Sequence, residues 1–380
     1  MQNCYRPYFM FRPLSVKTAV DYYKTHLGEG VLYAVKANPN ETVLSTLYDA
    51  GIRKFDVASL GEVIRIRTLF PDAEIYFMHP VKSRFAIRES YFKHKVRHFS
   101  LDSEMELHKI LQETDDADDL CLYLRLSVPN SYAEINLSNK FGIDHEKAPD
   151  LLKLISQRAR KLGICFHVGS QCMHPQAYRL AIQAAKKVID YAGVRLDFFN
   201  VGGGFPSVYP GMIPPPLIDY FTIIHQEFSQ INQDGAMTLL CEPGRSLVAE
   251  SMSVVVRVNL RREHDLYIND GTYGSLFDAG SLKFIFPTRL LRESHEETAD
   301  YLPFQFYGPT CDGIDFMPGP FYLPSDIDEG DYIEVGQIGA YGQAMATGFN
   351  GFGHEKELII TDSKPLMTMF GDDVFKEQAA

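Results

Sequence analysis

Eight short apolar runs recur at a regular interval in the first two-thirds of the sequence, separated by longer segments with helical periodicity. The runs are Val31–Val35, Phe55–Ser59, Ala73–His79, His98–Asp102, Leu120–Ser127, Gly163–Ser170, Phe198–Gly203 and Thr238–Gly244. Helical spacing is clearest in Ser103–Gln112 and Pro175–Tyr191, and Ser59–Glu62 and Ser103–Glu106 resemble capping boxes. Eight strand–helix units in about 245 residues predict a closed (β/α)8 barrel, with an open doubly wound α/β sheet as the competing layout.

The pattern changes after Gly244, where short β-like runs alternate with turn-rich stretches. The runs are Ser251–Leu260, Asp265–Asp270, Phe304–Thr310, Tyr332–Val335 and Glu357–Thr361. We interpret Met317–Pro324 as one of the turn-rich stretches between them. The expected fold is therefore an α/β barrel over residues 10–246, followed by an all-β domain over residues 247–380 that residues 1–9 join.

Length and charge narrow the class of protein. A chain of 380 residues is longer than one hydrophobic core usually supports, so its length predicts one large domain and one smaller domain. With 37 basic and 49 acidic residues, the net charge of −12 argues against nucleic acid or an anionic membrane as a partner. No apolar run approaches the ~20 residues of a membrane span, and Met1–Phe11 has no signal-peptide pattern. The six cysteines form no Cys-x-x-Cys pair, so we expect no disulfide framework, no metal site and a cytoplasmic location.

Polar and charged residues gather at the carboxyl ends of the predicted barrel strands, where (β/α)8 barrels place their active sites. They are Lys36, Asp56, Ser59, His79, Arg125, His167, Ser170 and Glu242, and the glycines Gly202–Gly204 lie at the same end. One such residue alone is more often structural, but burying so many without partners would be costly. Their shared position predicts an active site at this end of the barrel.

Two turns after the last predicted strands offer groups that bind phosphate. Asn200–Pro206 is a glycine-rich turn whose backbone N–H groups can approach an anion closely, although it lacks the ending of a P-loop. The next strand ends in Cys241–Arg245, which adds the guanidinium of Arg245. The loops after strands seven and eight are the usual phosphate site of such barrels. An ordinary Pro-Gly turn with a surface arginine is the alternative interpretation.

Lys36 stands at the end of an apolar strand, in the run Tyr33–Pro39. A lysine there either extends its amine to the barrel mouth or acts as a nucleophile. Pyridoxal phosphate requires an amine for its imine, an anchor for its phosphate and an acid beside its pyridine nitrogen. Because strand ends and turns supply all three groups, the sequence predicts pyridoxal 5'-phosphate as the cofactor.

The motifs that carry these residues resemble those of the fold-type III ornithine/lysine/arginine/diaminopimelate decarboxylases, in that family's order and over almost the whole chain. They are Tyr33–Asn38, Phe55–Ser59, His167–Ser170, Gly202–Pro206, Glu242–Arg245, Asp270–Ser275, Gly308–Asp315 and Gly339–Tyr341. The resemblance implies an alanine-racemase-like barrel, a C-terminal β-domain and a head-to-tail homodimer with active sites at its interface.

Residue by residue, the resemblance implies Lys36 as the Schiff-base lysine, His167 as the residue stacked on the cofactor ring and Glu242 as the partner of the pyridine nitrogen. The phosphate would be held by Ser170, Gly204, Arg245 and Tyr341. The other expected cofactor contacts are Asp56, Arg125, Gly202, Gly203 and Gly244.

The resemblance also assigns residues to the dimer interface. Cys311 and Asp312 would reach the active site of the partner subunit, and Lys140 would form an intersubunit salt bridge with Asp315. Cys311 is the expected catalytic proton donor to Cα after CO2 has left, because a thiol with a pKa of ~8.5 suits that task near neutral pH. Its alternative interpretation is a buried hydrophobic cysteine.

The charges of a few acidic residues indicate the type of reaction and the class of substrate. Glu242 favours decarboxylation over racemisation, because a carboxylate keeps the pyridine nitrogen protonated and so strengthens the electron sink. In the racemases that the family resembles, an arginine takes this place. Phe277, Asp278, Cys311 and Asp312 would contact the substrate, and the two aspartates favour one with a distal ammonium.

Cys311–Gly313 differs from the Cys-Glu-Ser typical of diaminopimelate decarboxylases, and therefore favours L-ornithine, giving putrescine and CO2 in polyamine biosynthesis. Phe277 stands where ornithine decarboxylases commonly have tyrosine, so a lysine or bifunctional lysine/ornithine decarboxylase is the main alternative. Arginine and diaminopimelate are less favoured. A non-catalytic homologue is disfavoured, because it should lack the imine lysine, the phosphate ligands or the thiol.

Overall fold

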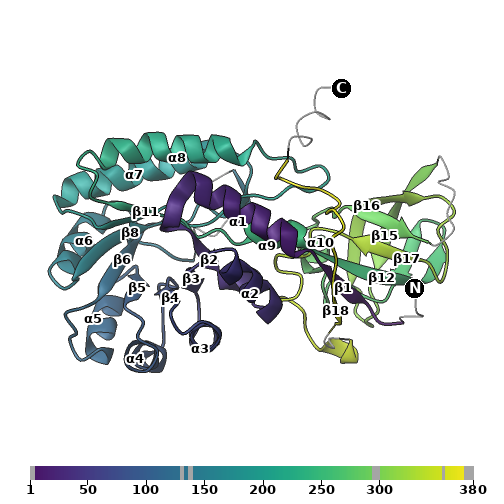
Figure 1. Cartoon of the computed structure of the whole chain (residues 1–380), viewed down its shortest axis with the longest axis horizontal. Helices are drawn as coiled ribbons and strands as arrows, with labels where there is room; N and C mark the ends of the chain where they lie inside the picture. The colour runs from purple at the N-terminus through teal and green to yellow at the C-terminus, as the bar shows by residue number, and fades with distance from the viewer. Residues whose placement is uncertain (1–4, 129–131, 136–139, 293–299, 353–355, 372–380) are drawn as a thin grey trace.

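Two eight-stranded sheets organise the computed structural model, one closed into a barrel and the other forming a separate β-domain (Figure 1). The structure describes residues 5–128, 132–135, 140–292, 300–352 and 356–371. The barrel occupies the left of Figure 1 and the β-domain the right, with α1 (Pro13–Leu27) crossing the middle.

The barrel strands are parallel and follow one another around the sheet in chain order. They are β2 (Leu32–Ala34), β3 (Lys54–Val57), β4 (Glu74–Phe77), β5 (His98–Leu101), β6 (Cys121–Arg125), β8 (Lys161–Cys165), β10 (Phe198–Asn200) and β11 (Thr238–Leu240). The helices that follow strands are α2 (Glu41–Asp49), α3 (Leu60–Leu69), α4 (Arg84–Phe92), α5 (Glu104–Glu113), α6 (Ala148–Ser156), α7 (Gln176–Ala192), α8 (Leu217–Ile231) and α9 (Arg245–Val248).

Hydrogen bonds between the first and last strands close the barrel. The N–H of Leu32 donates to the carbonyl of Cys241 at 2.8 Å, and the N–H of Cys241 donates to the carbonyl of Gly30 at 2.9 Å. A parallel bridge joins Val31 to Cys241 at the same place. These contacts confirm the (β/α)8 barrel and exclude the open doubly wound sheet.

The predicted helix starts at Ser59 and Ser103 are confirmed. The hydroxyl of Ser59 accepts from the N–H of Glu62 at 3.2 Å, and the Glu62 carboxylate accepts from the N–H of Ala58 at 2.6 Å. The hydroxyl of Ser103 caps α5 by accepting from the N–H of Glu106 at 3.3 Å, whereas the Glu106 carboxylate accepts from the N–H of Lys82 instead. Capping of this kind fixes where each helix leaves the strand end, and therefore how strand-end side chains are aimed.

The β-domain combines strands from both ends of the chain. Its sheet runs in the order β14 (Thr288–Leu291), β17 (Tyr332–Val335), β12 (Met252–Arg262), β13 (Asp265–Ile268), β15 (Tyr301–Tyr307) and β16 (Phe316–Pro324). The interpretation of Met317–Pro324 as a turn-rich stretch is wrong, because these residues pair with β15. β16 lies at the end of this strand order, where a strand tolerates proline since one side of its backbone needs no partner.

The N-terminal strand β1 (Tyr8–Phe11) pairs with β12 and with β18 (Leu358–Ile360). This pairing supports assigning the first residues to the β-domain, and the division at 246/247 stays a prediction. The domain also contains the short helix α10 (Phe277–Ser281), so it is not purely β. Among the described residues, no helix combines the length and apolar character needed to cross a membrane.

Candidate active site

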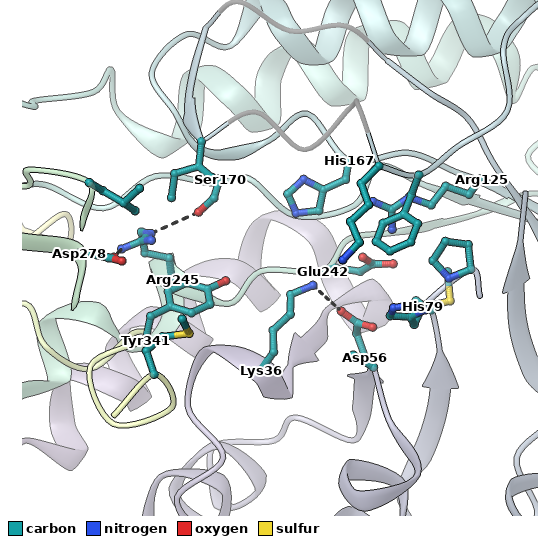
Figure 2. A pocket seen from close by; sticks show the side chains of 18 of the residues that line it. Lys36, Asp56, His79, Arg125, His167, Ser170, Glu242, Arg245, Asp278 and Tyr341 are labelled. Atoms are coloured by element: carbon teal, nitrogen blue, oxygen red, sulfur yellow. Dashed lines mark hydrogen bonds and ion pairs between the residues drawn. The ribbon is translucent and has the colours of Figure 1, made fainter. Parts of the chain in front are cut away.

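A cavity of about 500 Å3 opens at the carboxyl ends of the barrel strands, where Asp278 of α10 and Tyr341 also line it (Figure 2). Its polar lining residues include Lys36, Asp56, His79, Arg125, Lys140, His167, Ser170, Glu242, Arg245, Asp278 and Tyr341. The structure thus brings together most of the strand-end residues singled out in the sequence. Ser59 is an exception, because its hydroxyl caps α3 instead.

Lys36 lies in the middle of this cavity, on the turn Val35–Ala37 that follows β2. Its Nζ is 3.7 Å from Oδ2 of Asp56, and the side chain is 42% exposed. Burial lowers the pKa of Lys36, but the negative charge of Asp56, with smaller contributions from Tyr341 and Glu242, raises it above its ordinary value. The amine is therefore accessible and held in its protonated form by neighbouring carboxylates.

Glu242 and Asp56 are the buried carboxyl groups beside Lys36. Glu242 directly follows β11 and Cys241, and its Oε1 accepts from Nδ2 of Asn200 at 2.7 Å. Burial and then the charge of Asp56 raise the pKa of Glu242 to about 7, although Lys36 and Arg125 act in the opposite direction. Burial likewise raises the pKa of Asp56. Glu242 is thus poised to ionise when a cationic partner comes close.

Arg245 begins α9 and is the centre of a second polar group on the other side of Lys36 (Figure 2). Its Nη1 donates to Oη of Tyr209 at 2.9 Å and to Oδ2 of Asp278 at 3.0 Å, and its Nε donates to Oγ of Ser170 at 3.4 Å. The ring centroid of Tyr341 is 4.8 Å from its Cζ. Burial lowers the pKa of Arg245, but Tyr209 and Asp278 raise it above its usual range. A fixed guanidinium beside two hydroxyls suits a phosphate.

His167 faces the cavity from the loop after β8. Its Nδ1 accepts from the N–H of Gly169 at 2.9 Å, and burial followed by the charges of Lys36 and Arg125 holds its pKa well below the usual range. The ring is therefore neutral and fixed in orientation. A flat, uncharged ring of this kind suits stacking on an aromatic cofactor.

The glycine-rich turn lies behind this ring and does not line the cavity itself. A Cβ on Gly203 would lie 2.6 Å from the carbonyl oxygen of Glu242 and 3.0 Å from Nε2 of His167. Gly204 has a φ of +106°, and a Cβ there would lie 2.4 Å from a carbonyl oxygen of Gly169. A Cβ on Gly244 would lie 2.9 Å from the Cβ of Ala37. These glycines allow the strand-end loops to pack closely under the site.

Three features of the site differ from the sequence interpretation or were missed by it. Ser170 does not end a barrel strand, because β8 ends at Cys165 and Ser170 begins β9 (Ser170–Cys172), which pairs with β7 (Ala133–Ile135). Tyr209 was not singled out, since it lies in a loop without a recognisable motif. Met345 also lines the cavity.

Cys311 and Asp312 lie in the β-domain and, within the described part of the chain, are not among the residues that line this cavity. Cys311 is exposed, so its interpretation as a buried cysteine is wrong. Oδ2 of Asp312 accepts from Oη of Tyr273 at 2.5 Å. Their action in a partner's active site stays a prediction.

Asp315 and Lys140 are the residues predicted to form an intersubunit salt bridge. Asp315 is 3% exposed, and its carboxylate accepts from the N–H of Thr272 at 2.7 Å and from the hydroxyl of Thr310 at 2.7 Å. Lys140 is exposed at the cavity, with its Nζ 5.1 Å from the ring centroid of Phe141. The salt bridge stays a prediction, while the structure gives Asp315 an additional role within its own chain.

The donor set fits pyridoxal phosphate. Lys36 supplies an accessible amine, Arg245 and Ser170 supply a phosphate anchor, and Glu242 supplies a carboxyl group whose raised pKa makes it ready to pair with a ring cation. A guanidinium, an amine and a buried carboxyl group within one cavity meet each chemical requirement of this cofactor.

Comparisons with known proteins agree with this chemistry. Residues 15–249 match the pyridoxal binding domain of the pyridoxal-dependent decarboxylases. The lysine/ornithine decarboxylase of Selenomonas ruminantium is 32% identical over 361 residues, covering 92% of this chain and 88% of that protein. The ornithine decarboxylase of Panagrellus redivivus is 31% identical, covering 88% and 80%.

Solved structures with this fold are also similar. The arginine decarboxylase of Paramecium bursaria Chlorella virus has a TM-score of 0.84 at 26% identity, covering 95% of this chain and 97% of that one. The Selenomonas ruminantium lysine decarboxylase in complex with pyridoxal phosphate and cadaverine has a TM-score of 0.81 at 28% identity, covering 94% and 90%.

Proposed function

This chain belongs to the family of pyridoxal-dependent decarboxylases, and from that premise we propose that it converts L-ornithine to putrescine and CO2 in polyamine biosynthesis. Pyridoxal phosphate is its cofactor, and basic amino acids are its substrate class. The observation that carries the choice of a basic substrate is Asp278, a buried carboxylate in the wall of the active-site cavity; the preference for L-ornithine within that class rests on the run Cys311–Gly313. A negative charge at that depth favours a substrate with a distal ammonium.

When bound, the cofactor supplies a conjugated ring that accepts the electron pair left on Cα as CO2 departs. Lys36 would hold its aldehyde carbon, and Arg245, Ser170 and Tyr341 would hold its phosphate. Glu242 would hold a proton at the pyridine nitrogen, because its own pKa of about 7 falls once a cation pairs with it. His167, being neutral, would cover the ring without competing for that proton.

Asp278 would orient the far end of the substrate. Arg245 contacts its Oδ2, which leaves Oδ1 as the acceptor for a distal ammonium. The neighbouring Phe277 presents an apolar ring to the same cavity. An aliphatic chain ending in an ammonium matches a wall of this composition, whereas the second carboxylate of diaminopimelate would need a cation there.

The other half of the mechanism is proposed to come from a second copy of the chain. In a homodimer with shared active sites, the partner's Cys311 would protonate Cα and the partner's Asp312 would add a second carboxylate for the distal ammonium. Exposure of Cys311 supports this role, since a buried thiol could not reach another subunit. Lys140 with Asp315 is the proposed intersubunit contact, and the cytoplasm is the proposed location.

The second candidate is a lysine or bifunctional lysine/ornithine decarboxylase. Phe277 favours it, because an apolar side chain at this position makes no polar contact that would fix the length of the substrate. One methylene changes binding by only ~1–3 kcal/mol in such a pocket. The similarity to the lysine/ornithine decarboxylase of Selenomonas ruminantium supports the same candidate.

The deciding experiment is a kcat/KM comparison of L-ornithine, L-lysine, L-arginine and meso-diaminopimelate with the enzyme loaded with pyridoxal phosphate. We expect L-ornithine to give the highest value, L-lysine to follow within about two orders of magnitude, and meso-diaminopimelate to be the poorest substrate. A higher value for L-lysine would establish the second candidate. No turnover of any of the four would refute the proposal.

A further inference from the structure

A second cavity of about 340 Å3 lies away from the active site, where the C-terminal segment crosses α1 and the turn before β12. The segment is the yellow chain that leaves β18 in Figure 1. Nε of Arg12 donates to the carbonyl of Ser363 at 3.0 Å, and the ring of Phe370 stands edge-on to Tyr22 at 5.5 Å. We call this the C-terminal cavity. It shares no lining residue with the active-site cavity.

Glu250 lines the C-terminal cavity and is 3% exposed. Neither of its carboxylate oxygens has a hydrogen-bond partner among the described residues, and the same is true of the buried Oγ of Ser363 in the same wall. Thr368 and the backbone of Met369 face the carboxylate without a hydrogen bond of normal geometry. Native proteins rarely leave several buried polar atoms unpaired at one place, since each costs free energy.

The charges around the cavity indicate what could supply the missing donors. Arg12 is the buried cation in its wall, but its guanidinium already binds Glu334, Ser253 and the Ser363 carbonyl. Asp362 places a second, exposed carboxylate on the same cavity, together with the exposed Lys364. The described residues contain no group of three His, Cys, Asp or Glu side chains that could hold a metal ion, and this cavity offers only the two carboxylates of Glu250 and Asp362.

We propose that the C-terminal cavity binds an alkyl diammonium, with one ammonium at Glu250 and Ser363 and the other at Asp362. The apolar side chains of Leu14 and Pro365 line the same cavity and would contact the methylene chain. Bound there, the ligand holds the C-terminal segment against α1. The site consists of residues outside the catalytic machinery, and the inference therefore does not rest on the proposed function.

The test is equilibrium dialysis of labelled 1,4-diaminobutane against the full chain loaded with pyridoxal phosphate. We expect Glu250→Gln to bind one equivalent fewer per chain than the natural protein, with unchanged kcat/KM for its substrate. Glu329→Gln, an exposed carboxylate elsewhere, is the matched control and should bind as the natural protein does. The glutamine keeps the shape of the glutamate and needs no counterion, so Glu250→Gln should fold at least as stably.

The count distinguishes this site from the active site. If the active site binds no diamine, the natural protein and Glu250→Gln each bind one equivalent fewer per chain. The difference of one equivalent between the two proteins remains. Asp362→Asn should keep the number of sites and raise the Kd about two- to fivefold, as expected for an exposed charge pair. Equal stoichiometry in Glu250→Gln and the natural protein, or a Kd indifferent to Asp362→Asn, would overturn the proposal.

Discussion

Nη1 of Arg245 lies 3.0 Å from Oδ2 of Asp278, and the two side chains are only 3% and 7% exposed. Arg245 belongs to the barrel and Asp278 to the β-domain, so this ion pair crosses the junction of the two domains. It joins the proposed phosphate anchor to the proposed substrate contact. A change at either residue is therefore expected to reach the function of the other.

Asp278→Asn should separate these two functions. The amide cannot balance a distal ammonium, so KM for the substrate should rise roughly 10–100-fold, as expected when one partner of a buried charge pair is removed. Affinity for pyridoxal phosphate should increase, because Arg245 becomes freer to bind phosphate. Steady-state kinetics and a cofactor titration measure the two effects. Asp21→Asn, an exposed change on α1, is the control. Weakened cofactor binding with unchanged KM would assign Asp278 to the anchor alone.

Lys36 should carry the cofactor. Borohydride reduction followed by peptide mapping should place a pyridoxyl group on Lys36 and leave Lys82, a fully buried lysine bound to Glu106, unmodified. Lys36→Ala should give no such adduct and lose activity by several orders of magnitude, since the amine acts as a nucleophile. A pyridoxyl group on another lysine in the natural protein would contradict the assigned role.

The protonation of Glu242 should be visible in the stability of the cofactor-free protein. Its folded-state pKa of about 7 lies above the ordinary value of 4.5, so the folded state holds more protons between these two values. Stability should therefore fall as pH rises from about 4.5 to 7, by about 1–3 kcal/mol from this group. Burial also raises the pKa of Glu250 to about 7, so this residue likewise lowers the unfolding free energy as pH rises over the same range.

Glu242→Gln should remove the Glu242 contribution to this fall in unfolding free energy with pH. Urea unfolding at pH 5 and pH 8 would measure the difference. In the loaded enzyme the same variant should lower kcat by about 100-fold or more, because an amide cannot hold the pyridine nitrogen protonated. A slope unchanged by Glu242→Gln would mean that this carboxyl group does not titrate between those values.

Shared active sites predict that two inactive variants restore activity when mixed. Lys36→Ala and Cys311→Ala subunits should form hybrid dimers in which one of the two sites is intact, giving about a quarter of natural activity after random exchange. Cys311→Ala alone should slow turnover or release aldehyde by misplaced protonation. Activity of the mixture no greater than the average of the separate variants would exclude shared sites.

The repeating strand–helix pattern was sufficient to predict the barrel, because each unit shows its periodicity locally in the chain. The motifs around Lys36, Glu242 and Arg245 also placed three site residues correctly at one end of that barrel. The run Met317–Pro324 is a strand and not the turn-rich stretch that its sequence predicts, because its strand character does not show locally in the chain. Its prolines weaken a strand locally, and the pairing with β15 that makes it a strand is a contact between distant residues.

What the sequence by itself determined is the class of fold and the types of side chain at the strand ends. Only the tertiary structure decided their contacts. The loop residue Tyr209 meets Arg245, and Asp278 reaches the same guanidinium from another domain. Asp315 is enclosed by Thr272 and Thr310 of its own chain. These contacts depend on the positions of loops and domains, which long-range packing sets and which no local periodicity or propensity encodes.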